Sequence, residues 1–480
     1  MPRYALVTFG CQMNQHDSER IGEVLSGAGY EQTAEPAQAD LVLLNTCSVR
    51  EKAEQKLRSE VGRLGVLKRR RPGLLIGVAG CVAQQDGERL VERMPQIDLV
   101  IGPDNIPELP GLLAELSLGS PPRVRTVFDT ETPYFLPAAP VRGRHGPTAY
   151  VTVMKGCNER CSFCIVPYTR GPERYRPAGE LLDEIARLVD AGVREVTLLG
   201  QTVNSYRDPQ GSLPPAPGAG DSRWRHTRGA RAKEDESEFP ALLRRIAERV
   251  PGLARLRYAS PHPRHLTLSL IRAHQDLPLL CRHVHMPVQS GSDRVLHRML
   301  RRYSVAEYHE RLDALREAVP DVTLSTDVIV GFPGETREDF AGTLELVERA
   351  GFSGLFGFKY SERPYTPSLK LDNDVPEAEK SERLAELFAL SYRLRREHLA
   401  SRVGSVEEVL VEGPARGGGY TGRSEKNEIV HFGATDDPTG EIVALRIRRA
   451  FKNSLEGELC DEARRAPRAP ADDRRALPVV

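Results

Sequence analysis

Short apolar runs rich in β-branched residues alternate with helix-like stretches along most of this chain of 480 residues, and this alternation is the strongest constraint on its fold. In the first part of the chain, residues 4–9, 41–44 and 74–78 have the composition of buried strands. Helical patterns separate them, and Asn14 is a candidate N-cap of the first helix. Because parallel strands require a crossover connection, this order predicts a doubly wound parallel sheet with helices on both faces.

A second strand–helix series predicts a full or partial parallel (β/α) barrel. Its expected strands are residues 149–153, 195–199, 255–258, 283–286, 323–330 and 354–358. After a charged helix at about 377–399, short alternating stretches with glycine-rich turns predict a small antiparallel β-barrel. These stretches are residues 406–411, 420–423, 428–432 and 441–448. The predicted fold class is therefore α/β, with a doubly wound sheet, a partial barrel and a small β-barrel in that order.

Changes in composition suggest where the domains begin and end. Residues 119–142, rich in Pro, Gly and Arg, are expected to link an N-terminal domain of residues 1–118 to a core domain of residues 143–382. A Pro-, Gly- and Arg-rich insertion is expected to interrupt the core at residues 207–238. The β-rich domain should cover residues 383–458, and residues 459–480 should form a disordered tail.

Charge and hydropathy exclude some classes of protein. The formal net charge is +0, so no global positive field attracts nucleic acid, and an RNA partner would be held by local patches. The chain has no apolar run long enough for a membrane helix, and its first residues lack the regions of a signal peptide. We therefore expect a cytoplasmic location without a membrane partner. There, the 8 cysteines are more typical of metal ligands or catalytic groups than of disulfides.

Three cysteines directly follow the first strand of the second series with the spacing C-x3-C-x2-C: Cys157, Cys161 and Cys164, called here the loop triplet. So tight a loop can direct three thiolates to one iron–sulfur cluster, and the fourth iron of a cubane would keep an open position for catalysis. The alternative is a structural zinc site, which needs a fourth ligand. The nearest candidate for that ligand, His145, lies in the Pro-, Gly- and Arg-rich linker region and not at a fitting short spacing.

Three further cysteines, Cys11, Cys47 and Cys81, each follow a strand of the first series and are called here the sheet triplet. The C-terminal ends of parallel strands share one edge of the sheet, so these thiols should converge although they lie far apart in sequence. This predicts a second three-cysteine cluster, and the alternative is three buried thiols acting as small apolar side chains. No function is assigned to Cys281, at the end of an apolar run, or to Cys460, beside the expected tail.

The two triplets and their surroundings resemble the methylthiotransferase family of radical S-adenosylmethionine enzymes, and the resemblance runs through nearly the whole chain. The stretches that carry it are TFGCQMNQHDSER from Thr8, NTCSVREKAEQKL from Asn45, GCVAQQ from Gly80, GCNERCSFCIVPYTRG from Gly156, LLGQTVNSY from Leu198, HMPVQSGSDRVL from His285 and STDVIVGFPGE from Ser325. The resemblance implies an N-terminal methylthiotransferase domain, a partial radical barrel and a C-terminal TRAM domain that contacts RNA.

The resemblance also implies two 4Fe–4S clusters and S-adenosylmethionine as cofactors. The loop triplet would hold the cluster whose open iron binds S-adenosylmethionine, and the sheet triplet would hold an auxiliary cluster. Phe163 would pack near the adenine of S-adenosylmethionine, and Gly200, Gln201 and Gly331, at strand ends, would lie around this cofactor. Reduction by a donor such as flavodoxin or ferredoxin would then yield a 5′-deoxyadenosyl radical.

The residues after Cys11, Gln12-Met13-Asn14, resemble the subfamily that acts on isopentenylated adenosine. The implied substrate is N6-dimethylallyladenosine at position 37 of the tRNA anticodon loop, methylthiolated at C2. The C–H bond at C2 is unactivated, so a radical is needed. Alternatives with the same chemistry are threonylcarbamoyl-adenosine and a ribosomal-protein aspartate. An RNA-binding iron–sulfur protein without catalysis is an alternative of another class, and the open iron position argues against it.

Two features depart from the family pattern. The family usually has Arg-Pro-Gly-Thr near the last barrel strand, whereas this chain has Arg363-Pro364-Tyr365-Thr366. The insertion at residues 207–238 is also longer than usual. Neither feature includes an expected ligand, so only the local loop geometry is in question.

Basic residues of the C-terminal β-rich segment are candidate phosphate contacts: Arg416, Arg423, Lys426, Arg446, Arg448, Arg449 and Lys452. The alternative is a solvated charged surface. Acidic residues are as frequent in this segment, so the positive charge must lie on one side of the β-barrel to bind RNA.

Overall fold

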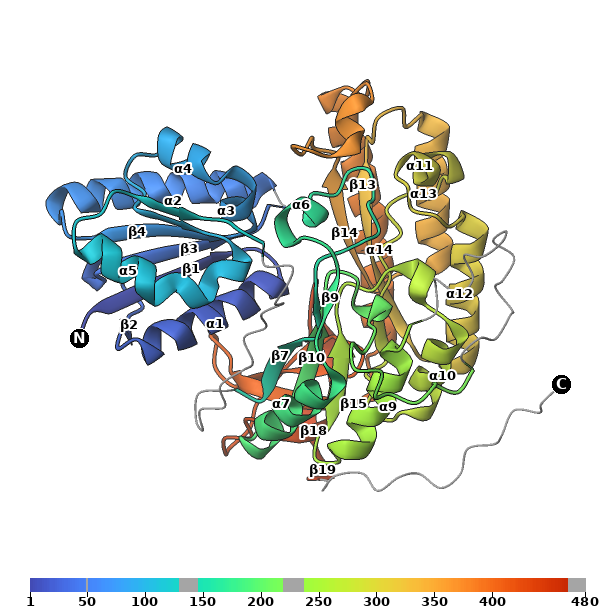
Figure 1. The fold of residues 1–480 in the computed structure, drawn as a ribbon. Helices are drawn as coiled ribbons and strands as arrows, with labels where there is room; N and C mark the ends of the chain where they lie inside the picture. Colours follow the sequence, from blue (N-terminus) through green and yellow to red (C-terminus); the bar gives the residue numbers. More distant parts are fainter. Residues whose placement is uncertain (49–50, 129–145, 219–236, 465–480) are drawn as a thin grey trace.

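The computed structural model describes residues 1–48, 51–128, 146–218 and 237–464. A parallel α/β unit, a partial barrel and a closed β-barrel follow one another along these residues, which confirms the predicted fold class (Figure 1). None of the helices in these ranges combines the length and the apolar composition that crossing a membrane requires.

The first unit is a 6-stranded parallel sheet with the order β2-β1-β3-β4-β5-β6. Its strands are β1 (Arg3–Phe9), β2 (Glu31–Gln32), β3 (Leu41–Thr46), β4 (Leu75–Gly80), β5 (Leu99–Ile101) and β6 (Arg123–Arg125). The apolar sides of α2 (Glu51–Arg70), α3 (Cys81–Asp86) and α4 (Glu88–Arg93) cover one face, and α1 (Gln12–Gly27) and α5 (Leu109–Ser117) cover the other (Figure 1). Both faces are thus buried, as the near-continuous apolar strands require.

Two expectations for this unit are wrong. Asn14 does not cap α1: Cys11 is the N-cap residue, and the buried Asn14 side chain donates instead to Asn45 at 3.2 Å. The expected linker also begins too early, because β6 pairs with β5 within it. A three-residue edge strand with one apolar side chain, Val124, has too little periodicity to be detected in a sequence. Residues 129–142 of the expected linker lie outside the described residues.

The core unit has six parallel strands in two sheets. One sheet has the order β11-β10-β7 and the other β12-β13-β14, and a parallel bridge between Leu256 and Leu280 joins them. The strands are β7 (Thr148–Thr152), β10 (Glu195–Leu199), β11 (Arg255–Tyr258), β12 (His283–His285), β13 (Thr323–Val330) and β14 (Gly354–Lys359). The outer helices are α7 (Ala178–Asp190), α9 (Phe239–Arg249), α10 (Leu268–Asp276), α12 (Val305–Ala318), α13 (Arg337–Ala350) and α14 (Glu377–Ser401). This arrangement is the predicted partial barrel.

The last unit is a closed barrel with the order β15-β16-β17-β19-β18. Its strands are β15 (Val406–Pro414), β16 (Tyr420–Ser424), β17 (Ile429–Phe432), β18 (Ile442–Ala450) and β19 (Leu455–Arg464). Two details differ from the sequence expectation. β17 and β19 pair in parallel, whereas the other pairs are antiparallel. The expected tail from residue 459 also begins too early, because β19 closes the barrel through backbone pairing. Its many charged residues gave no sign of a strand in the sequence.

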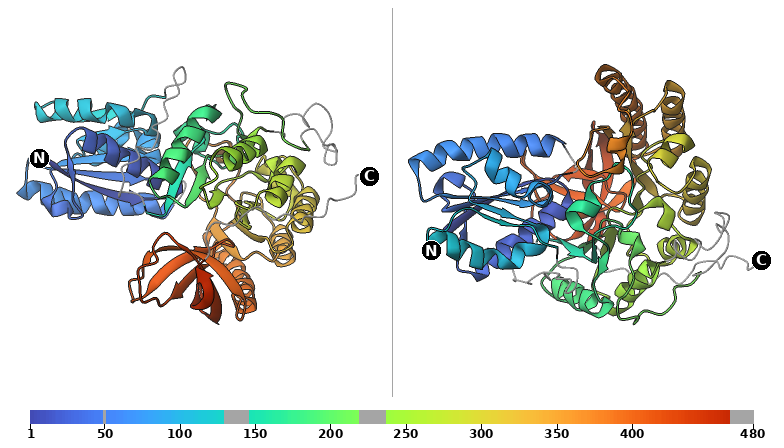
Figure 2. Two further views of the ribbon diagram at one scale, coloured as in Figure 1. Left: turned by 90° about the horizontal axis from the view of Figure 1, so that it is seen from below. Right: turned by 45° about the horizontal axis from the view of Figure 1, so that its top comes forward.

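Buried arginine contacts fix the β-barrel against the core. The Arg255 side chain, 2% exposed, donates to the carbonyl oxygens of Glu408 and Arg423, each at 2.7 Å. Thr323, the first residue of β13, donates to the carbonyl of Lys426 at 3.0 Å. The β-barrel therefore lies against the N-terminal ends of the core strands, beside α14 (Figure 2). The expected domain border between residues 382 and 383 falls inside α14.

Candidate functional site

The sheet triplet lies at the ends of three neighbouring strands. Thr46 of β3 pairs with Phe9 of β1 on one side and with Gly80 of β4 on the other. Cys47 and Cys81 directly follow Thr46 and Gly80, and Cys11 lies two residues after Phe9. The register therefore brings the three thiols to one edge of the sheet, as the sequence predicts. Cys47 and Cys81 are buried, and Cys11 is exposed.

Glycine is required where the sheet triplet leaves its strands. Gly80 has a φ of 89°, and a Cβ there would lie 2.2 Å from Oδ1 of Asn45. A Cβ on Gly10 would lie 2.8 Å from the Cβ of Cys47. Beneath these turns, the side-chain amide of Asn45 donates to the backbone carbonyl of Asn14 at 2.8 Å and to the hydroxyl of Ser18 at 2.9 Å. The close packing and these buried hydrogen bonds hold the cysteine-bearing turns in place.

The thiols of the sheet triplet have unequal electrostatic surroundings. A hydrogen bond from Cys47 lowers the pKa of the Cys11 thiol to about 6. Burial raises the pKa of Cys81, although Arg170 opposes this shift. Nε of Arg170 donates to Sγ of Cys81 at 3.2 Å, while its Nη2 pairs with Asp17 at 2.5 Å. Arg170 belongs to α6 (Val166–Arg170) of the core, which is labelled in Figure 1. A core side chain therefore reaches the sheet triplet.

The loop triplet lies between β8 (Met154–Lys155) and α6. Gly156 has a φ of 80°, and a Cβ there would lie 1.9 Å from the carbonyl oxygen of Pro172. The amide of Cys157 donates to the carbonyl of Gly171 at 3.1 Å, and that of Cys164 donates to the carbonyl of Cys161 at 3.0 Å. The loop is therefore wound tightly. Besides burial, the neighbouring Cys164 and Cys161 raise the pKa of Cys157, and Cys161 raises the pKa of Cys164.

Buried polar groups surround the loop triplet. Burial raises the pKa of Cys157, whose Sγ lies 3.0 Å from Oγ1 of Thr202. Burial, followed by the neighbouring Cys161, raises the pKa of Cys164 to about 12. Nη1 of Arg301 donates to Sγ of Cys161 at 3.4 Å. Thiols that are buried in this way lose their protons readily only to a metal, since metal binding replaces the proton.

Both triplets fit an iron–sulfur cluster better than a single ion. Each has three soft ligands and one buried guanidinium that donates to a thiol and would offset the negative charge of a cluster. Among the described residues, no three His, Cys, Asp or Glu side chains surround a point that suits one metal ion. A cubane is held through three different irons, so its ligands do not converge on one point. His145, the proposed fourth ligand of a structural zinc site, lies outside the described residues, so the structure does not test that alternative.

The other sequence-predicted cofactor contacts occupy two places beside the loop triplet. Oε1 of Gln201 accepts from the amide of Gly156 at 2.5 Å, and a Cβ on Gly200 would lie 2.6 Å from Cγ of Met154. Phe163 packs edge-on against Phe332, with ring centroids 6.5 Å apart. Gly331, directly before Phe332, has a φ of 68° and donates to Glu335 at 2.6 Å. Their contacts with S-adenosylmethionine stay predictions.

Sequence reasoning missed the side chains that touch the thiols. Arg170 and Thr202 lie within the family-like stretches, which offered a signal for them. Arg301 lies outside these stretches. It is flanked by Leu300 and Arg302, with φ values of 58° and 59°, which are uncommon for residues other than glycine. Only the folded turn, which brings Arg301 to Cys161, reveals its place.

The candidate phosphate contacts of the β-barrel do not form one uniform patch. Arg423 pairs with Glu412 at 3.1 Å, and Lys426 pairs with Asp321 at 3.5 Å. Arg448 pairs with Glu458. Arg449 and Lys452 lie 4.8 Å from the rings of Phe451 and Tyr392, respectively, while Arg416 and Arg446 are exposed. These ion pairs offset part of the positive charge, and the RNA role of the seven residues stays a prediction.

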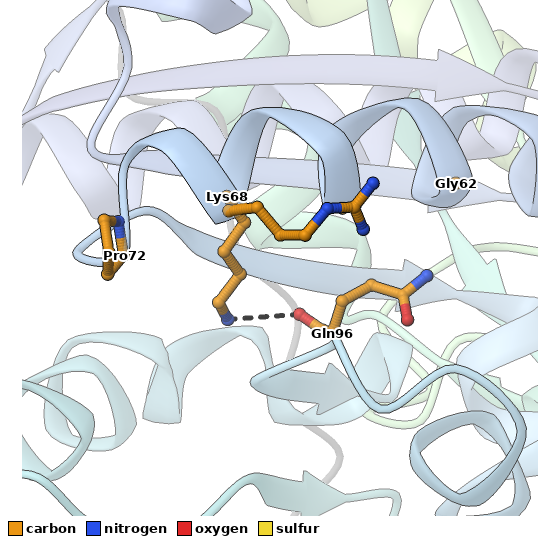
Figure 3. Close-up of a pocket in the computed structure, with 6 residues that line it drawn as sticks. Gly62, Lys68, Pro72 and Gln96 are labelled. Carbon is orange, nitrogen blue, oxygen red and sulfur yellow. Dashed lines mark hydrogen bonds between the residues drawn. The ribbon is translucent and has the colours of Figure 1, made fainter.

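A surface hollow lies far from both triplets along α2. It is lined by Gly62, Gly65, Lys68, Arg69, Pro72 and Gln96. Figure 3 shows Lys68 donating across it to the carbonyl of Gln96, at 3.1 Å. No sequence-predicted site residue lines this hollow, so it does not contribute to the candidate site.

Comparisons with known proteins agree with this architecture. Residues 3–102 match "Uncharacterized protein family UPF0004", residues 151–347 match the "Radical SAM superfamily" and residues 400–460 match the "TRAM domain". A structure of the radical S-adenosylmethionine methyltransferase TsrM from Kitasatospora setae superposes with a TM-score of 0.51 at 14% identity, over 85% of this chain and 81% of that one. The fold and the site thus define the class of radical S-adenosylmethionine proteins.

Similarity to curated relatives extends over the full chain. A tRNA-2-methylthio-N(6)-dimethylallyladenosine synthase of Sorangium cellulosum is 61% identical over 503 residues, covering 100% of this chain and 99% of the relative. A protein of the same name from Acidithiobacillus ferrooxidans is 43% identical, covering 99% and 100%. The chain belongs to the tRNA-2-methylthio-N(6)-dimethylallyladenosine synthase family of methylthiotransferases.

The lowered pKa of Cys11 predicts the reactivity of the metal-free protein. Cys11 should react with iodoacetamide faster than the buried thiols, with a rate that rises through a midpoint near pH 6, because only the thiolate reacts. Cys47→Ala removes the hydrogen-bond donor and should move the midpoint to higher pH. Peptide mass spectrometry after timed alkylation measures both rates. The same midpoint in the two proteins would contradict this assignment.

Proposed function

We propose that this chain attaches a methylthio group to C2 of N6-dimethylallyladenosine at position 37 of tRNA. The observation that carries the proposal is the contact of Arg170, six residues after Cys164, with Cys81. Through it, the two cysteine triplets lie at one border between the N-terminal sheet and the core. The relatives named for this activity, which match along the whole chain, support the same substrate.

In this proposal the six cysteines are cluster ligands, with the loop triplet holding the S-adenosylmethionine-binding 4Fe–4S cluster and the sheet triplet an auxiliary one. When bound, the clusters and S-adenosylmethionine supply the radical and the methylthio group. Gln201 holds the start of the cysteine loop through Gly156, and Arg170 and Arg301 offset thiolate charge. Phe163, Gly200 and Gly331 shape the surroundings of S-adenosylmethionine.

The RNA substrate must bring an unpaired base to the border between the triplets, since proteins read RNA mainly at unpaired nucleotides. In our proposal the N-terminal domain carries the auxiliary cluster, the core carries the radical chemistry and the β-barrel contacts phosphates of the same tRNA. The reaction takes place in the cytoplasm, and a flavodoxin or ferredoxin supplies the electron.

Removing each triplet separately tests the cluster assignment. Reconstituted wild-type protein should hold about eight irons, four for each cubane. Replacing Cys157, Cys161 and Cys164 by Ala should halve the iron content and abolish cleavage of S-adenosylmethionine. The matched triple replacement in the sheet triplet should halve the iron but leave cleavage in place. Iron analysis and quantification of 5′-deoxyadenosine measure these effects, and an unchanged iron content in either variant would refute that triplet's role.

The contact between Arg170 and Cys81 predicts a change in the potential of the auxiliary cluster. Arg170→Gln should lower its midpoint potential by roughly tens of millivolts, because a nearby positive charge favours the reduced, more negative state. Arg174→Gln is the matched control: Arg174 is also buried and crosses the same border, pairing with Asp104 at 2.6 Å. A redox titration followed by electron paramagnetic resonance compares the two. Equal shifts in both variants would show a general structural effect instead.

The substrate assignment predicts a preference for the dimethylallyl group. Two tRNAs that differ only in this group compete for the enzyme, and mass spectrometry of the digested tRNA measures methylthiolation of each. Burying the apolar group should favour the dimethylallylated tRNA by about 1–3 kcal/mol, or roughly 10- to 200-fold. Equal turnover of both tRNAs would exclude this substrate while leaving the cluster assignment intact.

A further inference from the structure

Two exposed tyrosines lie together at the border between the N-terminal sheet and the core. The ring centroids of Tyr168 and Tyr365 are 5.9 Å apart, with an angle of 35° between the planes. Tyr168 is 41% exposed and Tyr365 is 53% exposed. Aromatic side chains contribute most to stability when buried, so an exposed pair contributes little to the core. The pair instead offers two adjacent ring surfaces to a partner.

Contacts of the two segments place this pair beside both triplets. Tyr168 lies on α6, two residues before Arg170, and Arg170 contacts Cys81. Residues 363–370, called here the Tyr365 loop, contact the loop triplet, because the amide of Ser368 donates to the carbonyl of Ser162 at 2.9 Å. Arg363 of the same loop pairs with Glu54 of α2 at 3.2 Å. The loop therefore spans the border at which the substrate base must arrive.

The backbone of Tyr365 is strained. Its φ of 67° lies in the left-handed region, which glycine adopts without penalty and tyrosine does not. Because Tyr365 is 53% exposed, burial offsets little of this strain. Strain of this kind persists where a side chain serves a function that glycine cannot.

Exposed lysines belong to the two segments that meet at this border, and they could complement the charge of a nucleic acid. Lys52 and Lys56 lie on either side of Glu54 in α2, and Lys370 lies at the end of the Tyr365 loop, in a short 3-10 helix (Pro367–Lys370). Phosphates are held by such cations, whereas unpaired bases stack on aromatic rings. The combination favours a single-stranded nucleic acid over a protein partner.

We propose that Tyr168 and Tyr365 form a stacking surface for the unpaired base next to the target adenosine of the RNA substrate. The two tyrosines are positioning residues: stacking of the neighbouring base fixes the loop so that the target base reaches the border between the triplets. This inference rests on the proposed function for the identity of the RNA.

A thermodynamic cycle, in which the enzyme and the RNA are altered separately and together, tests the proposal. The probe is an RNA hairpin with the tRNA anticodon stem and loop, with or without the base on either side of the target adenosine. Wild-type holoenzyme should lose roughly ten-fold in affinity when the stacked base is removed. Tyr365→Gly should bind the intact hairpin about ten-fold more weakly and should not respond to removal of that base. Fluorescence anisotropy under anaerobic conditions measures each affinity.

Control variants separate stacking from folding. Tyr365→Phe keeps the ring and should retain wild-type affinity, and Leu369→Ala, which trims an apolar side chain 46% exposed in the same loop, should do the same. Tyr168→Leu should reproduce the loss seen with Tyr365→Gly. The melting temperature of Tyr365→Gly should equal or exceed that of wild type, because glycine relieves the left-handed strain.

Several outcomes would overturn the stacking role. One is an equal loss on base removal in wild type and Tyr365→Gly. Another is unchanged RNA affinity with slower reduction by a protein reductant, which would assign the pair to a protein partner. The cycle measures binding and not turnover, so its result is independent of the reaction. If wild-type enzyme loses affinity on base removal as expected but makes no methylthiolated product, the proposed function alone would be refuted.

Discussion

The buried guanidinium of Arg170 is the contact on which the arrangement of the two triplets depends. Burial by itself would lower its pKa, but the neighbouring Asp17 raises the pKa well above the usual value, so the side chain stays charged. It joins α6 of the core to α1 and to Cys81 of the N-terminal sheet. Removing one partner of such a buried pair leaves an uncompensated charge and typically costs about 3–5 kcal/mol. The Arg170 contacts therefore fix the core against the N-terminal sheet beside the sheet triplet.

The two triplets bring three thiols together through different backbone geometry. In the loop triplet, close sequence spacing and the left-handed Gly156 bring the thiols together. In the sheet triplet, strand register does so, with Gly80 allowing the sharp exit into α3. In both, one buried arginine donates to one thiol, through Arg170 or Arg301. Each site thus combines three soft ligands with a fixed positive charge, which suits an anionic cluster.

The position of the β-barrel has a consequence for RNA binding. It is held at the N-terminal ends of the core strands through Arg255 and Thr323, whereas the triplets lie near C-terminal strand ends. An RNA bound to both must extend along the side of the core. The strained Tyr365 and its neighbour Tyr168 lie at the end of that path which is nearer the thiols. In the proposed complex, phosphate contacts and base contacts are therefore separated in space, and the first orient the RNA while the second position the target.

The sequence by itself determined the fold class and the order of the three units, because these depend on local periodicity. It also placed the sheet triplet at one edge of the sheet, because each of its cysteines follows a strand. Its core strands at 195–199, 255–258 and 323–330 agree with the structure residue for residue. It failed at β6, which has a single apolar side chain, and at β19, which has many charged ones. Both segments form strands only through pairing with a neighbouring strand. Asn14, which has the side chain of a typical cap, is turned inward by Asn45.

Only the tertiary structure decided which arginine contacts which thiol and which aromatic rings remain exposed. Arg170 and Cys81 are 89 residues apart, Arg301 and Cys161 are 140 apart, and Tyr168 and Tyr365 come from different segments. Contacts at such separations depend on strand order, loop conformation and the docking of one unit on another. None of these leaves a periodic signal in the sequence, since the energy of each contact depends on partners that only folding brings together.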